Sequence, residues 1–243
     1  MTDAELARSI AREAGELLMR VRGTSGLTGA ALGDEGDARA NDLILNRLAT
    51  ERPGDSVLSE ESFDDQARCA TRRVWIVDPL DGTREYREGR GDWAVHVALA
   101  VDRAAAAGAV ALPALGRVLA SDEVVAPSPL PARPRMVVSR SRPPAIATAV
   151  ARALDAEMIP MGSAGAKAMA VVAGEADIYL HEGGQFEWDN CAPAAVALAH
   201  GYHASRIDGA PLVYNCPDPR LPDLLVCHPA LAARVLELVR AHA

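Results

Sequence analysis

Carboxylate residues follow apolar segments at several points of this 243-residue chain. Glu60 and Glu61 come after one short apolar run, Asp78 and Asp81 come after another, and Asp189 stands where a helix is expected to begin. Carboxylates rarely gather beside apolar elements unless a positive group is held there. Magnesium and manganese prefer such oxygen ligands and bind phosphate oxygens at the same time. The pattern therefore predicts a divalent-metal site that hydrolyses a phosphate ester.

The turn that begins at Asp78 has the sequence Asp-Pro-Leu-Asp-Gly-Thr. Proline fixes the backbone after Asp78 and removes one N–H donor, so the turn can direct Asp78, the Leu80 carbonyl and Asp81 into one space. A helix could begin at Gly82 and Thr83, whose free N–H groups would bind an anion. This short segment is thus predicted to supply metal ligands on one side and phosphate donors on the other.

Each of these groups has an ordinary structural explanation when it is taken alone. Asp-Gly-Thr is a common turn, and Asp-Pro often opens one. Glu60 and Glu61 by themselves are better explained as a solvated pair, and Asp189 could cap a helix as readily as it could ligate a metal. It is the joint occurrence of the three groups that favours the metal site.

The composition limits the classes of function that the chain can perform. Hydrophobic residues make up 49% of the chain, enough for a sizeable core, and the net charge is −8. An acidic protein without an aromatic and basic stripe is not expected to bind a nucleic-acid polymer. A small anionic substrate stays compatible with this charge, because bound divalent cations invert the local field.

The cysteines and the hydropathy pattern indicate in which cellular compartment the protein is expected. None of the four cysteines forms a Cys-x-x-Cys pair, which argues against zinc and thioredoxin-like sites, and a chain of this length does not need disulfides. The charged N-terminus is predicted to begin a helix, and no apolar run approaches the roughly 18–20 residues that span a bilayer. We therefore expect a soluble cytoplasmic protein that does not bind membranes.

The first third of the chain is predicted to be mostly helical. Thr2 and Glu5 fit a capping box, and apolar residues then recur at helical spacing to about residue 22. Residues 23–36 are rich in glycine and threonine and are predicted to form a loop or hairpin. A second helix is predicted over residues 37–51, where Pro53-Gly54 ends it.

Strands dominate the middle of the chain, and strands alternate with helices after it. Four prolines between Pro127 and Pro134 indicate a boundary between an N-terminal α+β lobe, residues 1–130, and a C-terminal α/β lobe, residues 134–243. The predicted strands cover residues 57–59, 74–77, 93–101, 109–112, 118–120, 136–138, 177–180 and 224–227. The later helices are predicted near residue 144, over 164–173, over 188–200 and after Pro229.

Three motifs resemble those of inositol-monophosphatase-like enzymes, in the same order and over nearly the whole chain. Leu58-Ser59-Glu60-Glu61-Ser62 is similar to their G-E-E-S element, residues 75–83 to W-I-x-D-P-x-D-G-T, and Trp188-Asp189 with the following Ala192 to W-D-x-x-A. The resemblance implies an α+β fold of the layered αβαβα sandwich type.

Within that superfamily the chain resembles most the bacterial 3′(2′),5′-bisphosphate nucleotidases of the CysQ type. Residues 137–142 are similar to their V-S-R-S-H element, and residues 162–167 to their G-S-S-L-K segment. Arg142 stands where histidine is frequent, Tyr86 where phenylalanine is usual, and Ala164-Gly165-Ala166 replaces the usual serine and leucine. These departures concern the substrate more than the chemistry.

The resemblance implies a role for each matching residue. Glu60, Asp78, the Leu80 carbonyl, Asp81 and Asp189 would ligate two or three magnesium ions, for which manganese could substitute. Asp37 and Thr83 would orient and deprotonate the attacking water, and the family's spacing to Glu60 selects Asp37 rather than Asp34. The residues implied to bind the phosphate or the substrate are Gly82, Thr83, Arg84, Ser139, Arg140, Lys167 and Glu182, together with Glu60 and Asp189.

Several of these residues keep an alternative interpretation. Lys167, the only lysine of the chain, could pair with a second phosphate or lie on a helix surface. Arg140 and Arg142 could bind the remaining phosphate or be surface arginines. Ser139 could contact the nucleotide or simply end a strand. His96 lies in an apolar strand and is expected to be packed rather than catalytic.

The leading hypothesis is hydrolysis of adenosine 3′,5′-bisphosphate to AMP and phosphate, with lithium sensitivity and a role in sulfur metabolism as corollaries of the resemblance. Inositol 1-phosphate and fructose 1,6-bisphosphate are the alternative substrates. A non-catalytic phosphate-binding homologue and a nucleic-acid exonuclease are the alternatives from other classes. Relatives occur as monomers and as dimers, so a homodimer is possible.

Overall fold

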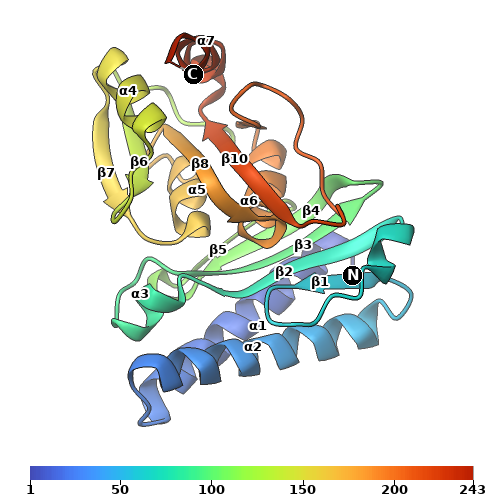
Figure 1. Ribbon diagram of the computed structural model, residues 1–243. Helices are drawn as coiled ribbons and strands as arrows, with labels where there is room; N and C mark the ends of the chain where they lie inside the picture. Colours follow the sequence, from blue (N-terminus) through green and yellow to red (C-terminus); the bar gives the residue numbers. More distant parts are fainter. Residues whose placement is uncertain (243) are drawn as a thin grey trace.

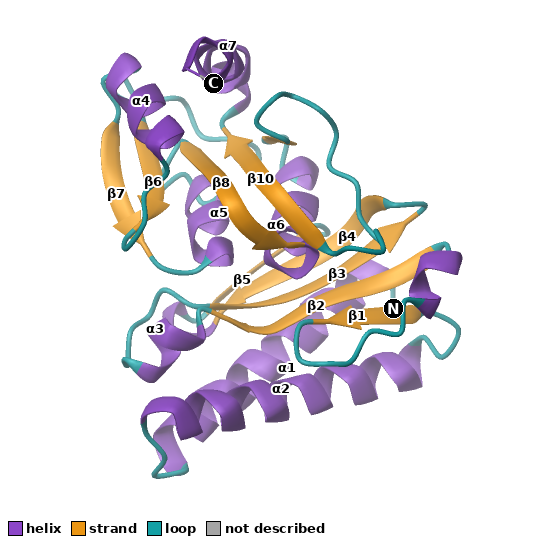
Figure 2. Cartoon of the chain, viewed as in Figure 1, coloured by secondary structure: helices purple, strands orange, loops and turns teal. Residues whose placement is uncertain are grey.

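The computed structural model describes residues 1–242, which form five layers (Figure 1). Two long helices cover one face of the first sheet, two buried helices separate the first sheet from the second, and two further helices cover the outer face of the second sheet (Figure 2). The predicted αβαβα sandwich is therefore confirmed.

The first sheet has the order β1-β2-β3-β4-β5 and the second has the order β7-β6-β8-β10-β9. Only β1 in the first sheet is parallel to its neighbour, whereas in the second sheet β6 is parallel to both β7 and β8. The strands are β1 Ser56–Ser59, β2 Arg73–Asp81, β3 Ala94–Val101, β4 Ala104–Leu112, β5 Arg117–Ala120, β6 Arg135–Ser139, β7 Glu157–Met161, β8 Ile178–Phe186, β9 His203–Ser205 and β10 Arg220–Cys227.

The α-helices are α1 Asp3–Thr24, α2 Gly29–Glu51, α3 Thr83–Arg87, α4 Ala145–Ala153, α5 Ala164–Val172, α6 Glu187–Ala199 and α7 Ala232–His242. Short 3-10 turns cover Ala67–Ala70, Pro113–Leu115 and Pro229–Leu231. The capping box of α1 is confirmed, because Glu5 N donates to Thr2 Oγ1 and Thr2 N donates to Glu5 Oε2. None of the helices in the described residues is long and apolar enough to cross a membrane.

The prediction of a loop or hairpin over residues 23–36 is wrong, because α2 begins at Gly29. Gly33 and Gly36 serve close packing instead of chain reversal, whereas Gly29, the first residue of the helix, has a φ of +58° and no close neighbour. A Cβ on Gly33 would lie 2.8 Å from Thr83 Cγ2, and a Cβ on Gly36 would lie 3.2 Å from Tyr86 Cε1. The helix can therefore approach the segment that follows β2 closely enough to bring its own Asp37 beside Thr83.

Two strands of the second sheet, β7 and β9, were not predicted. β7 contains Pro160 and lacks a regular alternation of buried and exposed residues, and β9 has only three residues. Residues 121–134, which connect the two sheets, contain neither helix nor strand, as the proline cluster led us to expect. The remaining predicted elements are present with shifted ends.

The first sheet approaches α6 closely at Gly108 of β4. A Cβ on Gly108 would lie 2.9 Å from Ala195 Cβ and 3.2 Å from the Ala192 backbone. Because protein interiors are close-packed, an added methyl group there forces either the strand or the helix to move. The glycine in β4 and the alanines of α6 thus set the distance between the two layers.

We predict that Gly108→Ala lowers the free energy of unfolding by about 1–3 kcal/mol, measured by urea denaturation. Gly23→Ala is the matched control, since Gly23 lies in α1 and an added Cβ meets nothing within 4 Å. Alanine in a helix is favoured over glycine, so this control should be neutral or slightly stabilising. Equal stability of the two variants would contradict the close contact between β4 and α6.

Candidate active site

The end of β2 carries two buried carboxylates, Asp78 and Asp81, which are only 1% and 7% exposed. In a regular strand two residues three apart face opposite sides of the sheet. The pairing of β2 with β3 shifts in register between Asp78 and Asp81, the interval that contains Pro79 and Leu80. This irregularity, together with the bond from Leu80 N to Asp78 Oδ1 (3.0 Å), lets both carboxylates reach the same space.

A third carboxylate enters this space from the other half of the chain. Asp189 lies in the first turn of α6, where its Oδ2 accepts a hydrogen bond of 2.6 Å from Phe186 N. One oxygen of each of Asp78, Asp81 and Asp189 lies within 4.8 Å of the others, which is close enough to share one metal ion. Asp189 therefore both caps its helix and faces the other two acids.

Glu60 reaches the same group because β1 is parallel to β2. Ser59 pairs with Val77, and Glu60 N donates to the Val77 carbonyl at 3.3 Å, so the two strands end side by side. The residue as a whole is exposed to solvent, but its carboxyl group hydrogen-bonds to Asp78. Glu61 is exposed beside it.

Burial and mutual repulsion raise the pKa values of most of these acids. Burial, then Glu60 and Asp81, raises the pKa of Asp78 well above its ordinary value. Burial and the charge of Asp189 raise the pKa of Glu60 to about 7, and burial and the charge of Asp81 raise the pKa of Asp189 to about 6. Buried oxygen ligands that repel one another fit a divalent cation such as Mg²⁺, whose charge would relieve the repulsion.

Asp81 differs from the other acids because protein donors already surround it. Gly165 N donates to Asp81 Oδ2 at 2.6 Å and Ala164 N donates to Oδ1 at 3.2 Å, so the carboxylate sits on the N-terminus of α5. Burial alone would raise its pKa, but His96 and the Gly165 N–H hold the pKa of Asp81 below its ordinary value. The positive end of the helix and the carboxylate stabilise one another.

Asp37 and Thr83 are brought together from α2 and α3. Burial raises the pKa of Asp37 to about 7, with further contributions from Glu61 and Glu60, while a hydrogen bond with Thr83 opposes the rise. Thr83 Oγ1 also lies 3.1 Å from the Leu80 carbonyl, a second acceptor for the same hydroxyl proton. The Thr83 hydroxyl therefore lies between Asp37 and a predicted metal ligand.

Gly82 gives the chain the turn that ends β2 and begins α3. Its φ of +89° is one that residues with a side chain rarely adopt, and a Cβ there would lie 2.9 Å from Ser163 Cβ. Glycine is thus required at this position for two reasons: the backbone conformation and the close approach of the loop before α5.

A cavity of about 300 Å³ opens beside the carboxylates. It lies between the end of β2 with α3, the end of β6, the first turn of α5, β8 and the start of α6. Of the predicted site residues it is lined by Asp81, Gly82, Arg84, Ser139, Arg140, Lys167 and Asp189. Glu182 does not line it and is exposed on β8, opposite Asp223 of β10.

The basic residues around this cavity have different partners. Lys167 is only 5% exposed, so it is not a surface lysine, and its Nζ donates to the carbonyls of Ser163 (2.8 Å) and Gly162. Arg140 forms ion pairs with Glu85 (3.2 Å) and Asp92, and Arg84 pairs with Glu88 at 2.9 Å. Lys167 is thus bonded to neutral groups, whereas both arginines face carboxylates.

Several lining residues were missed by sequence reasoning. Tyr179 and His181 form one wall of the cavity from β8, and Lys167 Nζ lies 5.3 Å from the Tyr179 ring centroid. Glu85, Ser141, Met161, Gly184 and Gln185 also line it. The available signal was the sequence of β8 beyond Leu180, with its two consecutive glycines. It could not show which side chains of β8 face the cavity, because that depends on how the second sheet is placed.

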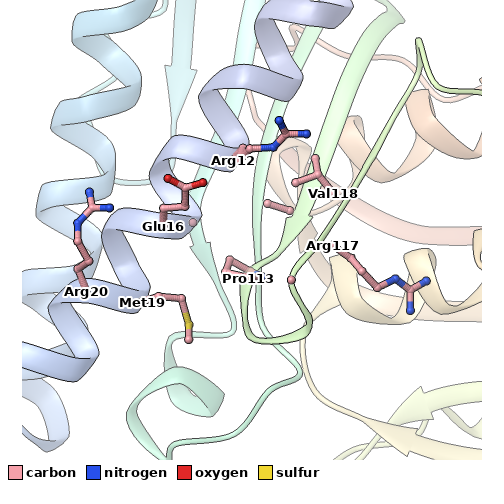
Figure 3. A pocket seen from close by; sticks show the side chains of 10 residues that line it. Arg12, Glu16, Met19, Arg20, Pro113, Arg117 and Val118 are labelled. Carbon is pink, nitrogen blue, oxygen red and sulfur yellow. The ribbon is translucent and has the colours of Figure 1, made fainter.

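A separate cavity of about 410 Å³ lies between α1 and the start of β5 (Figure 3). Arg12, Arg20 and Arg117 line it, together with Glu16, Met19 and Pro113. The guanidinium groups of Arg20 and Arg117 point in different directions, and Arg117 is paired with Glu175. These charges do not converge on one point, so the cavity has no arrangement that would bind an anion.

The family model for the inositol monophosphatase family matches residues 2–126 and 130–243. The chain belongs to this family. A 3′-phosphoadenosine 5′-phosphate phosphatase from Mycobacterium leprae (strain TN) is 52% identical over 99% of this chain and 94% of its own length. The 3′(2′),5′-bisphosphate nucleotidase CysQ of Escherichia coli (strain K12) is 31% identical over 85% of this chain and 91% of its own length.

Solved structures agree with the fold. Inositol monophosphatase II from Staphylococcus aureus MSSA476 superposes with a TM-score of 0.83 over 98% of this chain and 95% of that chain, at 20% identity. CysQ from Bacteroides thetaiotaomicron superposes with a TM-score of 0.78 over 93% of this chain and 97% of that chain, at 27% identity. The predicted family and fold are confirmed, and the named relatives are phosphatases.

The raised pKa values predict how stability depends on pH without metal. Glu60, Asp37 and Asp189 bind protons in the folded state up to pH 6–7 but only to about pH 4 when unfolded. The folded state therefore binds more protons between pH 4.5 and 7, and stability falls as the pH rises through this window. In EDTA we expect the Tm to be on the order of 5 °C lower at pH 8 than at pH 5.5.

Saturating Mg²⁺ is the comparison for this measurement. Because the metal binds the ionised carboxylates, it should stabilise the folded protein more at pH 8 than at pH 5.5 and reduce the difference. Thermal unfolding followed by circular dichroism in EDTA and in Mg²⁺ measures both effects. A metal-free Tm that rises from pH 5.5 to pH 8 would contradict the repulsion among these acids.

Proposed function

We propose that this protein is a magnesium-dependent phosphomonoesterase that hydrolyses adenosine 3′,5′-bisphosphate to AMP and phosphate. The observation that carries this proposal is the meeting of Asp78, Asp81 and Asp189, from both halves of the chain, beside a cavity that contains the buried cation of Lys167. The 3′-phosphoadenosine 5′-phosphate phosphatase that is 52% identical supports the choice of substrate. Lithium inhibition and a role in sulfur metabolism belong to the same proposal.

The residues that would hold Mg²⁺, or Mn²⁺ in its place, are Glu60, Asp78, Asp81, Asp189 and the carbonyl of Leu80. When bound, such ions neutralise phosphoryl charge and make water more acidic. Two or three ions would use this set. The all-oxygen ligand set, in which Asp78 and Asp81 are buried, and the raised pKa values of Asp78, Glu60 and Asp189 support this role.

The protein's own groups then move a proton and hold the phosphate. The Thr83 hydroxyl takes a proton from the attacking water and passes it to Asp37, whose pKa of about 7 suits a proton acceptor near neutral pH. The N–H groups of Gly82 and Thr83 bind phosphoryl oxygens at the start of α3. Asp37 is held in place by its contact with Thr83 and by the close packing of α2.

The second phosphate of the substrate is proposed to bind Lys167. Its ammonium group is buried, lines the cavity and bonds to neutral carbonyls, so its charge is available to an anion. Ser139, Arg140 and Arg84 line the same cavity and would contact the remainder of the nucleotide. Glu182 lies outside this cavity, and nothing in its position supports the substrate contact that the resemblance implied.

Inositol 1-phosphate is the second candidate substrate, because the family model that matches this chain is that of the inositol monophosphatases. Fructose 1,6-bisphosphate is the third. A non-catalytic homologue would be expected to lack a ligand or Thr83, and every expected position is filled here. Steady-state rates of phosphate release from the three substrates, with and without Mg²⁺, distinguish these functions.

Asp37→Asn tests the proton acceptor. Asparagine keeps the size of the side chain but cannot accept the proton, so we expect kcat to fall by about 10²–10⁴-fold with Mg²⁺ binding retained. Asp34→Asn is the matched control on the same helix, because Asp34 is exposed and should leave kcat within a few-fold of wild type. Equal losses in the two variants would remove Asp37 from the mechanism.

Lys167→Met tests whether Lys167 binds the second phosphate of the substrate. Methionine retains a long apolar side chain in the buried site but lacks the charge, so kcat/KM for adenosine 3′,5′-bisphosphate should fall by at least ~10-fold. The rate with adenosine 3′-monophosphate, which has no second phosphate, is the internal control and should change little. A variant that loses both rates equally would place Lys167 in the structure of the site and not in substrate selection.

A further inference from the structure

His96 of β3 is fully buried, as expected from the sequence. Its ring nevertheless contacts Asp81 on one side and the backbone beside Asp189 on the other. Its Nδ1 donates to the Trp188 carbonyl at 2.9 Å, since a carbonyl can only accept. Its Nε2 faces Asp81 Oδ2 at 3.2 Å. Trp188 immediately precedes Asp189, so one imidazole ring extends from a ligand on β2 to the first turn of α6, which carries another.

The start of α5 is built to accommodate this ring. A Cβ on Gly165 would lie 2.0 Å from His96 Nε2, so inside the packed core either the ring or the helix would have to shift. Gly165 N also donates to the same Asp81 Oδ2 at 2.6 Å. The glycine at this position, within a segment that departs from the family motif, is therefore explained by the histidine beside it.

Asp81, which His96 contacts, differs from the other two acids in where its hydrogen-bond partners lie in the sequence. The backbone N–H groups that bond to Asp78 and Asp189 belong to residues within three positions of them, Leu80 and Phe186, and Asp78 also bonds to the carboxyl group of Glu60. Asp81 is held by groups that are distant in sequence, on α5 and on β3. Its position relative to Asp189 thus depends on how the two halves of the chain are joined.

We propose that His96 is a positioning residue for the metal site. It fixes the spacing between Asp81 and the first turn of α6, so that ligands from the two halves of the chain can hold one ion. This inference rests on the proposed metal-dependent function. His96 lies behind the carboxylates and does not line the cavity, so it would act through Asp81 and Asp189 without touching the substrate.

Two substitutions separate the contacts of the ring. The amide nitrogen of asparagine can occupy the place of Nδ1, so His96→Asn keeps the bond to the Trp188 carbonyl and loses the contact with Asp81. The amide nitrogen of glutamine can occupy the place of Nε2, so His96→Gln keeps a donor for Asp81. We expect His96→Asn to bind Mg²⁺ about 10–100-fold more weakly than wild type and His96→Gln to recover much of that loss.

Isothermal titration with Mg²⁺, and electron paramagnetic resonance with Mn²⁺, measure this affinity without turnover. Urea denaturation of the same proteins measures stability, which a purely structural role would lower equally in both variants. Gly165→Ala keeps the histidine but displaces its ring, and should also weaken Mg²⁺ binding. This third variant gives the answer if His96→Asn does not fold.

His200 provides the matched control. It is also a buried histidine, and its ring nitrogens bond to Val125 N and to the Ala120 carbonyl at the far end of α6. His200→Asn should lower stability and leave Mg²⁺ affinity unchanged. Wild-type affinity in His96→Asn, or equal losses in His96→Asn and His200→Asn, overturns the inference about His96. A wild-type protein that binds no divalent metal overturns the proposed function itself.

Discussion

Repulsion among carboxylates buried at the end of β2 is the constraint on which the rest of the site depends. Asp78, Asp81 and Asp189 share one small space, with Glu60 at its edge. Ionised acids in such a place are unfavourable unless positive charge or N–H donors face them. The fold supplies several hydrogen-bond donors to Asp81 and few to Asp78, Glu60 and Asp189. The raised pKa values of these three acids show that their negative charge is not compensated by the protein, so a cation from solution could bind there.

The middle layer of the sandwich, α5 and α6, places hydrogen-bond donors beside two of these acids, Asp81 and Asp189. α5 and α6 both begin beside the carboxylates, so the positive ends of two helices face the same negative group. Both helices lie between two sheets and consist largely of alanine and other small residues, which allow the sheets to approach. The close contact at Gly108 and the tight fit at Gly165 are consequences of the same arrangement.

The turn from Asp78 to Thr83 could be predicted from the sequence, because its ligands are close in the chain and its proline and glycine restrict the backbone. Asp189 was predicted because helix starts have local signals. The first turns of α2 could not be predicted, since Gly33 and Gly36 are explained only by what packs against them. The contact of His96 with Asp81 and the burial of Lys167 likewise depend on strands and helices that are distant in sequence.

The neighbours of the basic residues explain why substrate selection centres on one of them. The guanidinium of Arg140 already faces Glu85 and Asp92, so an incoming phosphate would have to compete with two carboxylates for it. Lys167 bonds to two backbone carbonyls, which use two of the three N–H donors of its ammonium group and form no ion pair with it. An anion in this cavity can therefore bond to the lysine without displacing a carboxylate from a direct ion pair, and a substrate with a second phosphate is the one that can use it.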